Sequence, residues 1–123
     1  ELADGLAQTG KINCTFQYHG PDEHLPTQVE IEIYRIVQEA VNNTIKHANA
    51  DNLTIQLNRL DDEINLHIED NGDGFDVADK KVAGGLGLTS LEKRAQKIEG
   101  NLHIDSYPGR GTTIILEIPL PHE

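Results

Sequence analysis

Three polar residues of one predicted helix carry groups that could act on a bound phosphate compound. On a helix, with about 100° per residue, Glu39, Asn43 and Lys46 fall within an arc of about 60°, roughly opposite the apolar residues. A carboxylate, an amide oxygen and an ammonium group one turn apart could orient a water molecule, ligate magnesium and contact a phosphate. Asn42 and His47 flank this arc. A solvated helix face is the alternative, although adjacent asparagines in mid-helix lower helix stability without a compensating role.

Two glycine-containing segments follow, each next to a predicted element. The segment Asp70–Phe75 (DNGDGF) comes directly after a predicted strand, and a plain turn would explain it because Asn-Gly and Asp-Gly favour positive φ. It does not fit an EF-hand calcium loop, since Gly72, Gly74 and Phe75 stand at its third, fifth and sixth positions. The segment Gly84–Leu88 (GGLGL) precedes a predicted helix, so its backbone amides and the helix N-terminus could receive an anion.

The apolar pattern predicts the elements that must position these residues. Alternation predicts strands over residues 12–18, 53–57, 64–68, 102–106 and 112–118, and helical spacing predicts helices over 27–48 and 87–99. The apolar face of the first helix is predicted to contain Ile33, Ile36, Val37, Ala40, Val41, Thr44, Ile45 and Ala48. Thr27 and Glu30 fit a capping box at its start, and Cys14 is predicted to be a buried core thiol. This order indicates an α+β fold in which helices cover one face of a mixed or mostly antiparallel sheet.

Length and composition limit the class of protein. The 123 residues fit one domain, with residues 1–10 expected to be the tail of an upstream segment and 11–123 to be the domain. Because the chain lacks methionine, we expect it to be a piece of a longer protein. Its single cysteine excludes an internal disulfide, its six histidines lack zinc-ligand spacing, and no apolar stretch is long enough to span a membrane.

The charge balance restricts the partners further. Ten Lys and Arg residues against 21 Asp and Glu residues give a formal net charge of −11. This field repels polyanions and argues against nucleic acid as a partner. A phosphate ligand would need a divalent cation and local hydrogen-bond donors to bind such an acidic chain.

Four segments, in this order along the chain, resemble the motifs of one ATPase superfamily. They are Glu39-x-x-x-Asn43-x-x-Lys46-His47, Asp70-x-Gly72-x-Gly74, Gly85-Leu86-Gly87-Leu88 and Gly109-Arg110-Gly111-Thr112. They resemble the N box, two glycine boxes and final G-x-G-T segment shared by gyrase, the ninety-kilodalton heat-shock chaperone and the mismatch-repair ATPases. The chain looks like the catalytic and ATP-binding domain of a bacterial sensor histidine kinase. Its segment Gln38–His47 further resembles the nitrate-sensor and DesK-like kinases.

The resemblance implies a fold and a role for each motif residue. The fold would be the Bergerat ATP-binding fold, a two-layer α/β sandwich with a mixed sheet of about five strands. Asp70 would accept a hydrogen bond from the adenine amino group, with Thr112 completing the contact through water. Asn43 would ligate magnesium, and Glu39 would hold a metal-bound or attacking water. The remaining expected ATP-binding residues are Lys46 and His47 at the phosphates, Gly72 and Gly74 beside the base, and Gly85, Leu86, Gly87 and Leu88 at the end of an ATP lid spanning residues 76–88.

The implied activity is transfer of the γ-phosphoryl group of Mg-ATP to a histidine on the kinase's upstream dimerisation domain. The phosphoacceptor histidine would lie outside this chain, and the parent would be a homodimer that signals to a NarL-like response regulator. This domain would lie in the cytoplasm, alone or as the cytoplasmic part of a membrane-anchored sensor. No direct contact of this domain with nucleic acid or membrane is expected. Two alternatives stay open: a related ATPase or anti-sigma-type serine kinase, and a non-catalytic binding module.

Overall fold

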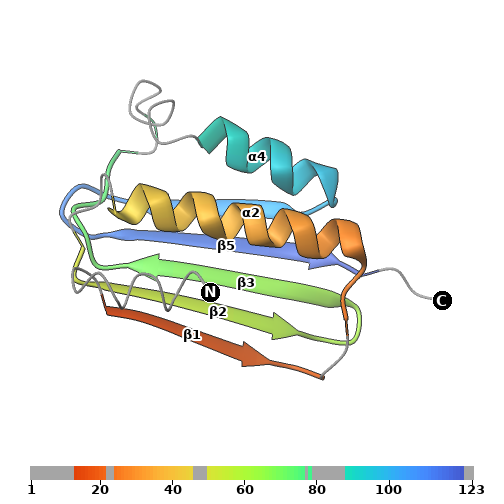
Figure 1. Cartoon of the computed structure of the whole chain (residues 1–123). Coiled ribbons are helices and arrows are strands. Elements are labelled where there is room, and N and C mark those ends of the chain that lie inside the picture. Colours follow the sequence, from red (N-terminus) through yellow and green to blue (C-terminus); the bar gives the residue numbers. More distant parts are fainter. Residues whose placement is uncertain (1–12, 22–23, 46–49, 77, 79–87, 121–123) are drawn as a thin grey trace.

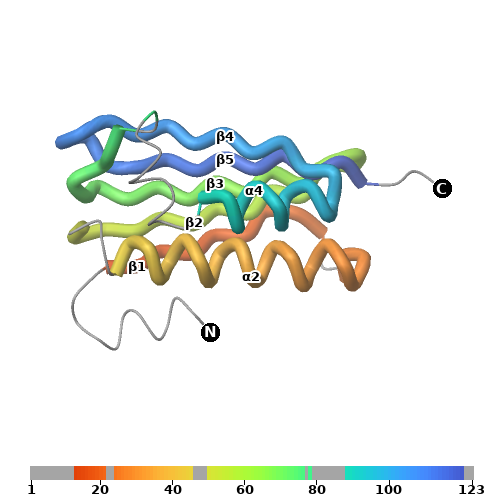
Figure 2. The backbone as a smooth tube through the Cα atoms, turned by 90° about the horizontal axis from the view of Figure 1, so that it is seen from above, coloured from red at the N-terminus to blue at the C-terminus, as the bar shows by residue number. Residues whose placement is uncertain are grey.

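The computed structural model describes residues 13–21, 24–45, 50–76, 78 and 88–120 (Figure 1). The elements along the chain are β1 (Asn13–His19), α2 (Thr27–Asn43), β2 (Asn52–Arg59), β3 (Glu63–Asp70), α4 (Leu88–Lys97), β4 (Asn101–Ser106) and β5 (Thr112–Pro119). Five strands form a sheet in the order β1-β2-β3-β5-β4. β1 pairs with β2 in parallel, and the other neighbours are antiparallel, so the sheet is mixed. Figures 1 and 2 show α2 and α4 on one side of it, which confirms the predicted two-layer α+β fold.

One face of the sheet supplies the core, because side chains alternate along each strand. Ile55 of β2, Ile68 of β3 and Ile114 of β5 lie side by side in register, and all three are buried. Ile36 of α2 and Leu91 of α4 belong to the same core cluster, each with no exposed surface. Burial of this apolar surface is the main force that holds the helices on the sheet. Within the described ranges, no helix is long and apolar enough to cross a membrane.

The two ends of α2 differ from the sequence prediction. Pro26 is the N-cap, and no side chain caps this end, so the expected capping box of Thr27 and Glu30 does not form. Thr27 is already helical, and the Glu30 amide donates to the Pro26 carbonyl at 3.0 Å. At the other end Thr44 is buried but Ile45 is 46% exposed, which corrects its predicted place on the apolar face. The backbone adopts π-type geometry at residues 44–45, and this change of period turns Ile45 away from the core.

β1 is less buried than its alternation predicts. Phe16 and Tyr18 are 47% and 40% exposed, and Cys14 is only partly buried although it packs against the core. The reason is position, since β1 is an edge strand with a neighbour on one side only. Partial burial still raises the pKa of the Cys14 thiol above its ordinary value.

α4 begins and ends close to its predicted limits. Leu91, Ala95 and Ile98 are buried, as their helical spacing predicts. The residue after this turn of helix, Glu99, has the left-handed conformation with φ of 57°, which glycine adopts more readily. Gly100 follows, and its amide donates to the Ala95 carbonyl at 2.8 Å. A Cβ at Gly100 would lie 2.8 Å from a Leu116 methyl carbon, so a larger residue here would require that side chain of β5 to shift.

Candidate functional site

Asp70 ends β3 on the face of the sheet that the helices cover. It pairs with Leu53 of β2 and Thr112 of β5, and it shares its side of the strand with buried Ile68. The Gly72 amide donates to Asp70 Oδ1 at 2.8 Å. Desolvation by burial raises the pKa of the Asp70 carboxyl, while hydrogen bonds from the backbones of Gly72 and Thr112 oppose that rise. The result is a partly buried carboxylate at the end of an apolar row.

Ser106, which the sequence did not single out, holds the start of β5 to the loop after β3. Its hydroxyl is buried, donates to the Gly111 carbonyl at 2.9 Å and accepts from the Phe75 amide at 2.9 Å. Thr112 Oγ1 lies 2.9 Å from the same oxygen. Because the single proton of Ser106 goes to Gly111, Thr112 must donate in this pair. The Thr112 oxygen therefore presents only lone pairs to its other neighbours.

Two of the motif glycines are required by close backbone contacts. Gly74 has φ of +66°, and a Cβ there would lie 2.1 Å from the Tyr107 carbonyl oxygen. Gly111 has φ of +77°, and its Cβ would lie 2.3 Å from the Asp70 carbonyl oxygen. The two loops therefore touch along their backbones, and the Gly109 amide adds a hydrogen bond to the Asp73 carbonyl. Gly72 is buried in the same loop.

Asn71 fastens this loop to the start of β2. Its side-chain oxygen accepts hydrogen bonds from the backbone amides of Asp51 and Asn52, at 2.9 and 2.8 Å. From the sequence, Asn71 is expected only as part of a turn. Its partners lie 19 and 20 positions earlier in the chain, so no local pattern around Asn71 indicates this contact.

Glu39 faces α4 and not open solvent. Its Oε2 accepts a hydrogen bond from Ser90 Oγ at 3.3 Å and lies 3.5 Å from Arg94 Nε. Asn43 lies one turn further along α2 and is partly buried. The helix face that carries Glu39 thus lies against another helix, and the solvated-face alternative is wrong at this position.

The other predicted site residues divide into two groups. Leu88 is the first residue of α4, and its side chain is buried in the core, so only its backbone remains for a ligand. The rest lie outside the described residues; these are Lys46, His47, Gly85, Leu86 and Gly87. Among the described residues, no cluster of three or more His, Cys, Asp or Glu side chains could hold a metal ion. Asn43 and Glu39 supply oxygen donors, the type that magnesium prefers.

The described site residues lie at one end of the domain. Figure 1 shows the end of α2, the start of α4, the end of β3 and the start of β5 at the same end of the sheet. Glu39 and Asn43 come from α2, whereas Asp70 and Thr112 come from the paired strands below. The fold therefore places the α2 residues and the strand residues of the predicted site at the same end of the domain.

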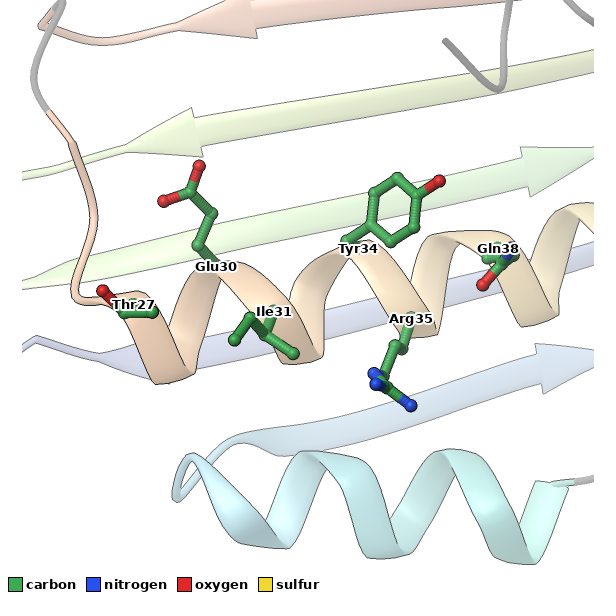
Figure 3. Close-up of a pocket in the computed structure, with 6 residues that line it drawn as sticks. All are labelled: Thr27, Glu30, Ile31, Tyr34, Arg35 and Gln38. Atoms are coloured by element: carbon green, nitrogen blue, oxygen red, sulfur yellow. The ribbon is translucent and has the colours of Figure 1, made fainter.

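A pocket of about 610 Å³ lies elsewhere, on the outer face of α2 (Figure 3). It contains none of the predicted site residues, and its lining comes from α2: Thr27, Glu30, Ile31, Tyr34, Arg35 and Gln38. Glu30 and Tyr34 point to one side of the helix and Arg35 points toward α4. This pocket shares no residue with the arrangement around Asp70 and Glu39.

Comparison with known proteins identifies clear relatives. Residues 28–122 match the family described as histidine kinase-, DNA gyrase B-, and HSP90-like ATPase. The chain is 40% identical over 112 residues to the signal transduction histidine-protein kinase/phosphatase DegS of Brevibacillus brevis, covering 91% of this chain and 29% of that protein. It is also 40% identical over 102 residues to the sensor protein VraS of Staphylococcus aureus, covering 83% and 29% respectively. The chain thus spans less than a third of these curated relatives.

Solved structures share the fold at low sequence identity. The blue-light activated histidine kinase of Erythrobacter litoralis EL346 superposes with a TM-score of 0.75 at 24% identity, covering 97% of this chain and 39% of that one. The ATP binding domain of PrrB from Mycobacterium tuberculosis gives a TM-score of 0.71 at 22% identity, covering 98% and 90%. At this identity the likeness shows that the architecture is the same.

Proposed function

The chain belongs to the family of histidine kinase-, DNA gyrase B- and HSP90-like ATPases, and we propose that it is the catalytic and ATP-binding domain of a sensor histidine kinase. It binds Mg-ATP and donates the γ-phosphoryl group to a histidine on the dimerisation domain of its parent protein. The observation that carries this proposal is the Asp70 carboxylate, partly buried at the end of β3 and paired in register with Thr112. The chain's relatives DegS and VraS are named as a histidine-protein kinase/phosphatase and a sensor protein.

Asp70 selects the base by its hydrogen-bonding character. An ionised carboxylate only accepts hydrogen bonds, so it pairs with the amino group of adenine and repels the carbonyl oxygen of guanine. The backbone hydrogen bonds from Gly72 and Thr112 favour this ionised form. Because Thr112 donates its proton to Ser106, its hydroxyl oxygen is available to accept a hydrogen bond from a water molecule beside the base.

The α2 residues serve the phosphate end. Asn43 would hold magnesium, which supplies neutralisation of phosphate charge on a chain of net charge −11. Lys46, His47 and the backbone of Gly85, Leu86, Gly87 and Leu88 contact the phosphates, and Glu39 orients a water molecule. Phosphoryl transfer needs mainly positioning and charge neutralisation, so this set requires no covalent nucleophile.

The parent protein extends beyond this chain. We place it among the nitrate-sensor and DesK-like kinases on the form of the segment Gln38–His47. Its upstream dimerisation domain forms a homodimer and carries the phosphoacceptor histidine. A NarL-like response regulator receives the phosphoryl group, and the domain works in the cytoplasm.

Calorimetric titration of the chain with a non-hydrolysable ATP analogue tests the proposed binding of Mg-ATP. We expect magnesium-dependent binding of the ATP analogue and much weaker binding of the matching GTP analogue. A folded chain that binds neither would overturn the proposal. The proposed phosphoryl transfer is tested by adding a separately made dimerisation domain and labelled ATP, which should yield acid-labile phosphohistidine. Rapid phosphate release without transfer would favour the related ATPase.

A further inference from the structure

A buried carboxylate on α2 lies outside the family motifs and faces α4. Glu32 is only 3% exposed, although it is a charged residue type, because it stands beside Ile33 on the buried side of the helix. Its Oε2 accepts from Gln28 Nε2 at 3.1 Å and lies 3.8 Å from Lys97 Nζ, and its Oε1 lies 3.4 Å from Arg94 Nη1. A charged group removed from water needs such partners to remain charged.

Arg94 also reaches the predicted site. Its Nη1 donates to Glu32, whereas its buried Nε makes no hydrogen bond within the described part of the chain and lies 3.5 Å from Oε2 of Glu39, as an ionic contact. Glu32 and Glu39 are seven positions apart, or about two helical turns, so both project from the same side of α2. One guanidinium group therefore connects a buried carboxylate to a site carboxylate that is 29% exposed.

The two contacts of Glu39 use the same oxygen. Ser90 and Arg94 both approach Oε2, and no hydrogen bond or ion pair reaches Oε1 within the described part of the chain. A carboxylate held through one oxygen can present the other in a fixed direction. This is the arrangement needed to orient a water molecule.

We propose that Arg94 is a positioning residue that holds the Glu39 carboxylate through its anchor on buried Glu32. This inference rests on the proposed function, because Glu39 matters only if it orients water beside the nucleotide. The guanidinium plane is rigid, so fixing its Nη1 end on Glu32 restricts where its Nε end lies. A lysine has a single ammonium group and cannot connect two carboxylates in this way; among the described residues, Lys97 pairs with Glu32 and not with Glu39.

The chain offers a matched control for this role. Arg94 and Lys97 lie on α4 and both contact Glu32, but only Arg94 contacts Glu39. We expect Arg94→Met to lower kcat for transfer to the separate dimerisation domain by about tenfold, with less than about threefold change in KM for ATP. Lys97→Met should leave both constants unchanged.

A double-mutant cycle separates positioning from a general structural role. In a Glu39→Gln background, Arg94→Met should cause no further loss of kcat, because the carboxylate through which Arg94 acts has already been removed. An equal loss in both backgrounds would overturn the proposal. Arg94→Lys should restore the thermal unfolding midpoint lost in Arg94→Met while leaving kcat low, and full recovery of kcat would also count against it.

The four chains of the double-mutant cycle distinguish this inference from the proposed function. They are the parent chain, Arg94→Met, Glu39→Gln and the variant with both substitutions. If the parent chain binds no ATP analogue, the proposed function fails at that step. The contact itself is then still tested by urea unfolding of the four chains, where the two substitutions should be non-additive. Strict additivity would show that Arg94 does not act on Glu39.

Discussion

The end of β3 and the helix pair α2–α4 hold their predicted site residues by different kinds of contact. Around Asp70, two loops are joined by hydrogen bonds of 2.8–2.9 Å between side chains and backbone groups and by glycines at close approach. Around Glu39, side-chain contacts of 3.3–3.5 Å join two helices. Short hydrogen bonds to backbone groups tolerate little displacement, whereas longer contacts between two side chains tolerate more. We therefore expect the end that binds the base to be the more rigid of the two, although Arg94 restricts the position of Glu39 at the phosphate end.

Adding one methyl group at Gly111 should cause the largest loss of stability. In Gly111→Ala the new Cβ would meet the Asp70 carbonyl oxygen, and the left-handed backbone adds strain, so we expect a loss of about 2–4 kcal/mol in the free energy of unfolding. Gly109→Ala is the matched control. Gly109 also has positive φ, but a Cβ there meets nothing within 4 Å, so its cost should stay near 1 kcal/mol. Equal losses in urea unfolding would show that the backbone contact is unimportant.

Replacing the carboxylate tests the selectivity of the rigid end. Asp70→Asn should weaken binding of the ATP analogue by about 10- to 100-fold, because the new amide group presents a donor to the adenine amino group. Adenine selectivity over guanine should be lost, with the circular dichroism spectrum unchanged. Titration calorimetry measures both affinities. A folded variant that binds the ATP analogue as tightly as the parent would refute the role given to Asp70.

Removing the buried hydroxyl should have a smaller effect. Ser106→Ala leaves the Phe75 amide and the Gly111 carbonyl without their partner, at a cost of about 1–3 kcal/mol in unfolding free energy. Thr113→Ala serves as a control, because Thr113 is the next residue after Thr112 and projects from the opposite face of the sheet. If both variants are equally stable, the hydroxyl does not join the loops.

The pH dependence of stability gives the smallest signal. Burial raises the pKa of folded Asp70 above its unfolded value, so the folded state binds this proton more tightly. The stability from this group is fully present below the unfolded pKa and is lost as the pH rises through the folded pKa. Asp70→Asn should therefore remove a segment of negative slope from a plot of unfolding free energy against pH above about pH 4. An unchanged slope would contradict the raised pKa.

The local pattern of apolar residues was enough to predict much of the fold. The alternation around Ile55 and Ile68 placed β2 and β3, and the position of Asp70 directly after an apolar strand placed it at the sheet end. The pattern failed for β1, where Phe16 alternates correctly yet is exposed. Burial depends on what covers a strand, and an edge position cannot be read from periodicity.

The contacts between elements were harder to predict than the motif residues. Arg94 and Glu32 are 62 positions apart, and their pairing depends on how α4 lies against α2. A carboxylate beside Ile33 on an apolar helix face was a usable signal for Glu32, because a buried charge requires a partner. Nothing in the local sequence marks Ser106, whose role arises because the loop after β3 and the turn before β5 meet at one hydroxyl.

The parallel pairing of β1 with β2 affects how the domain opens and closes. β2 and β3 are joined by a short turn, and so are β4 and β5, whereas Asn13 meets Asn52 across 39 positions and the whole of α2. Local hairpins close faster than such distant pairings, because less chain entropy is lost on closure. The pairing of β3 with β5 is also distant along the chain, but both of those strands have neighbours on two sides, whereas β1 lies at the edge of the sheet and pairs on one side only. We therefore expect β1 to separate from the sheet more easily than β3 or β5. In hydrogen–deuterium exchange its amides should lose protection before those of β3, so the domain can loosen at this edge while the strands that carry Asp70 and Thr112 stay paired.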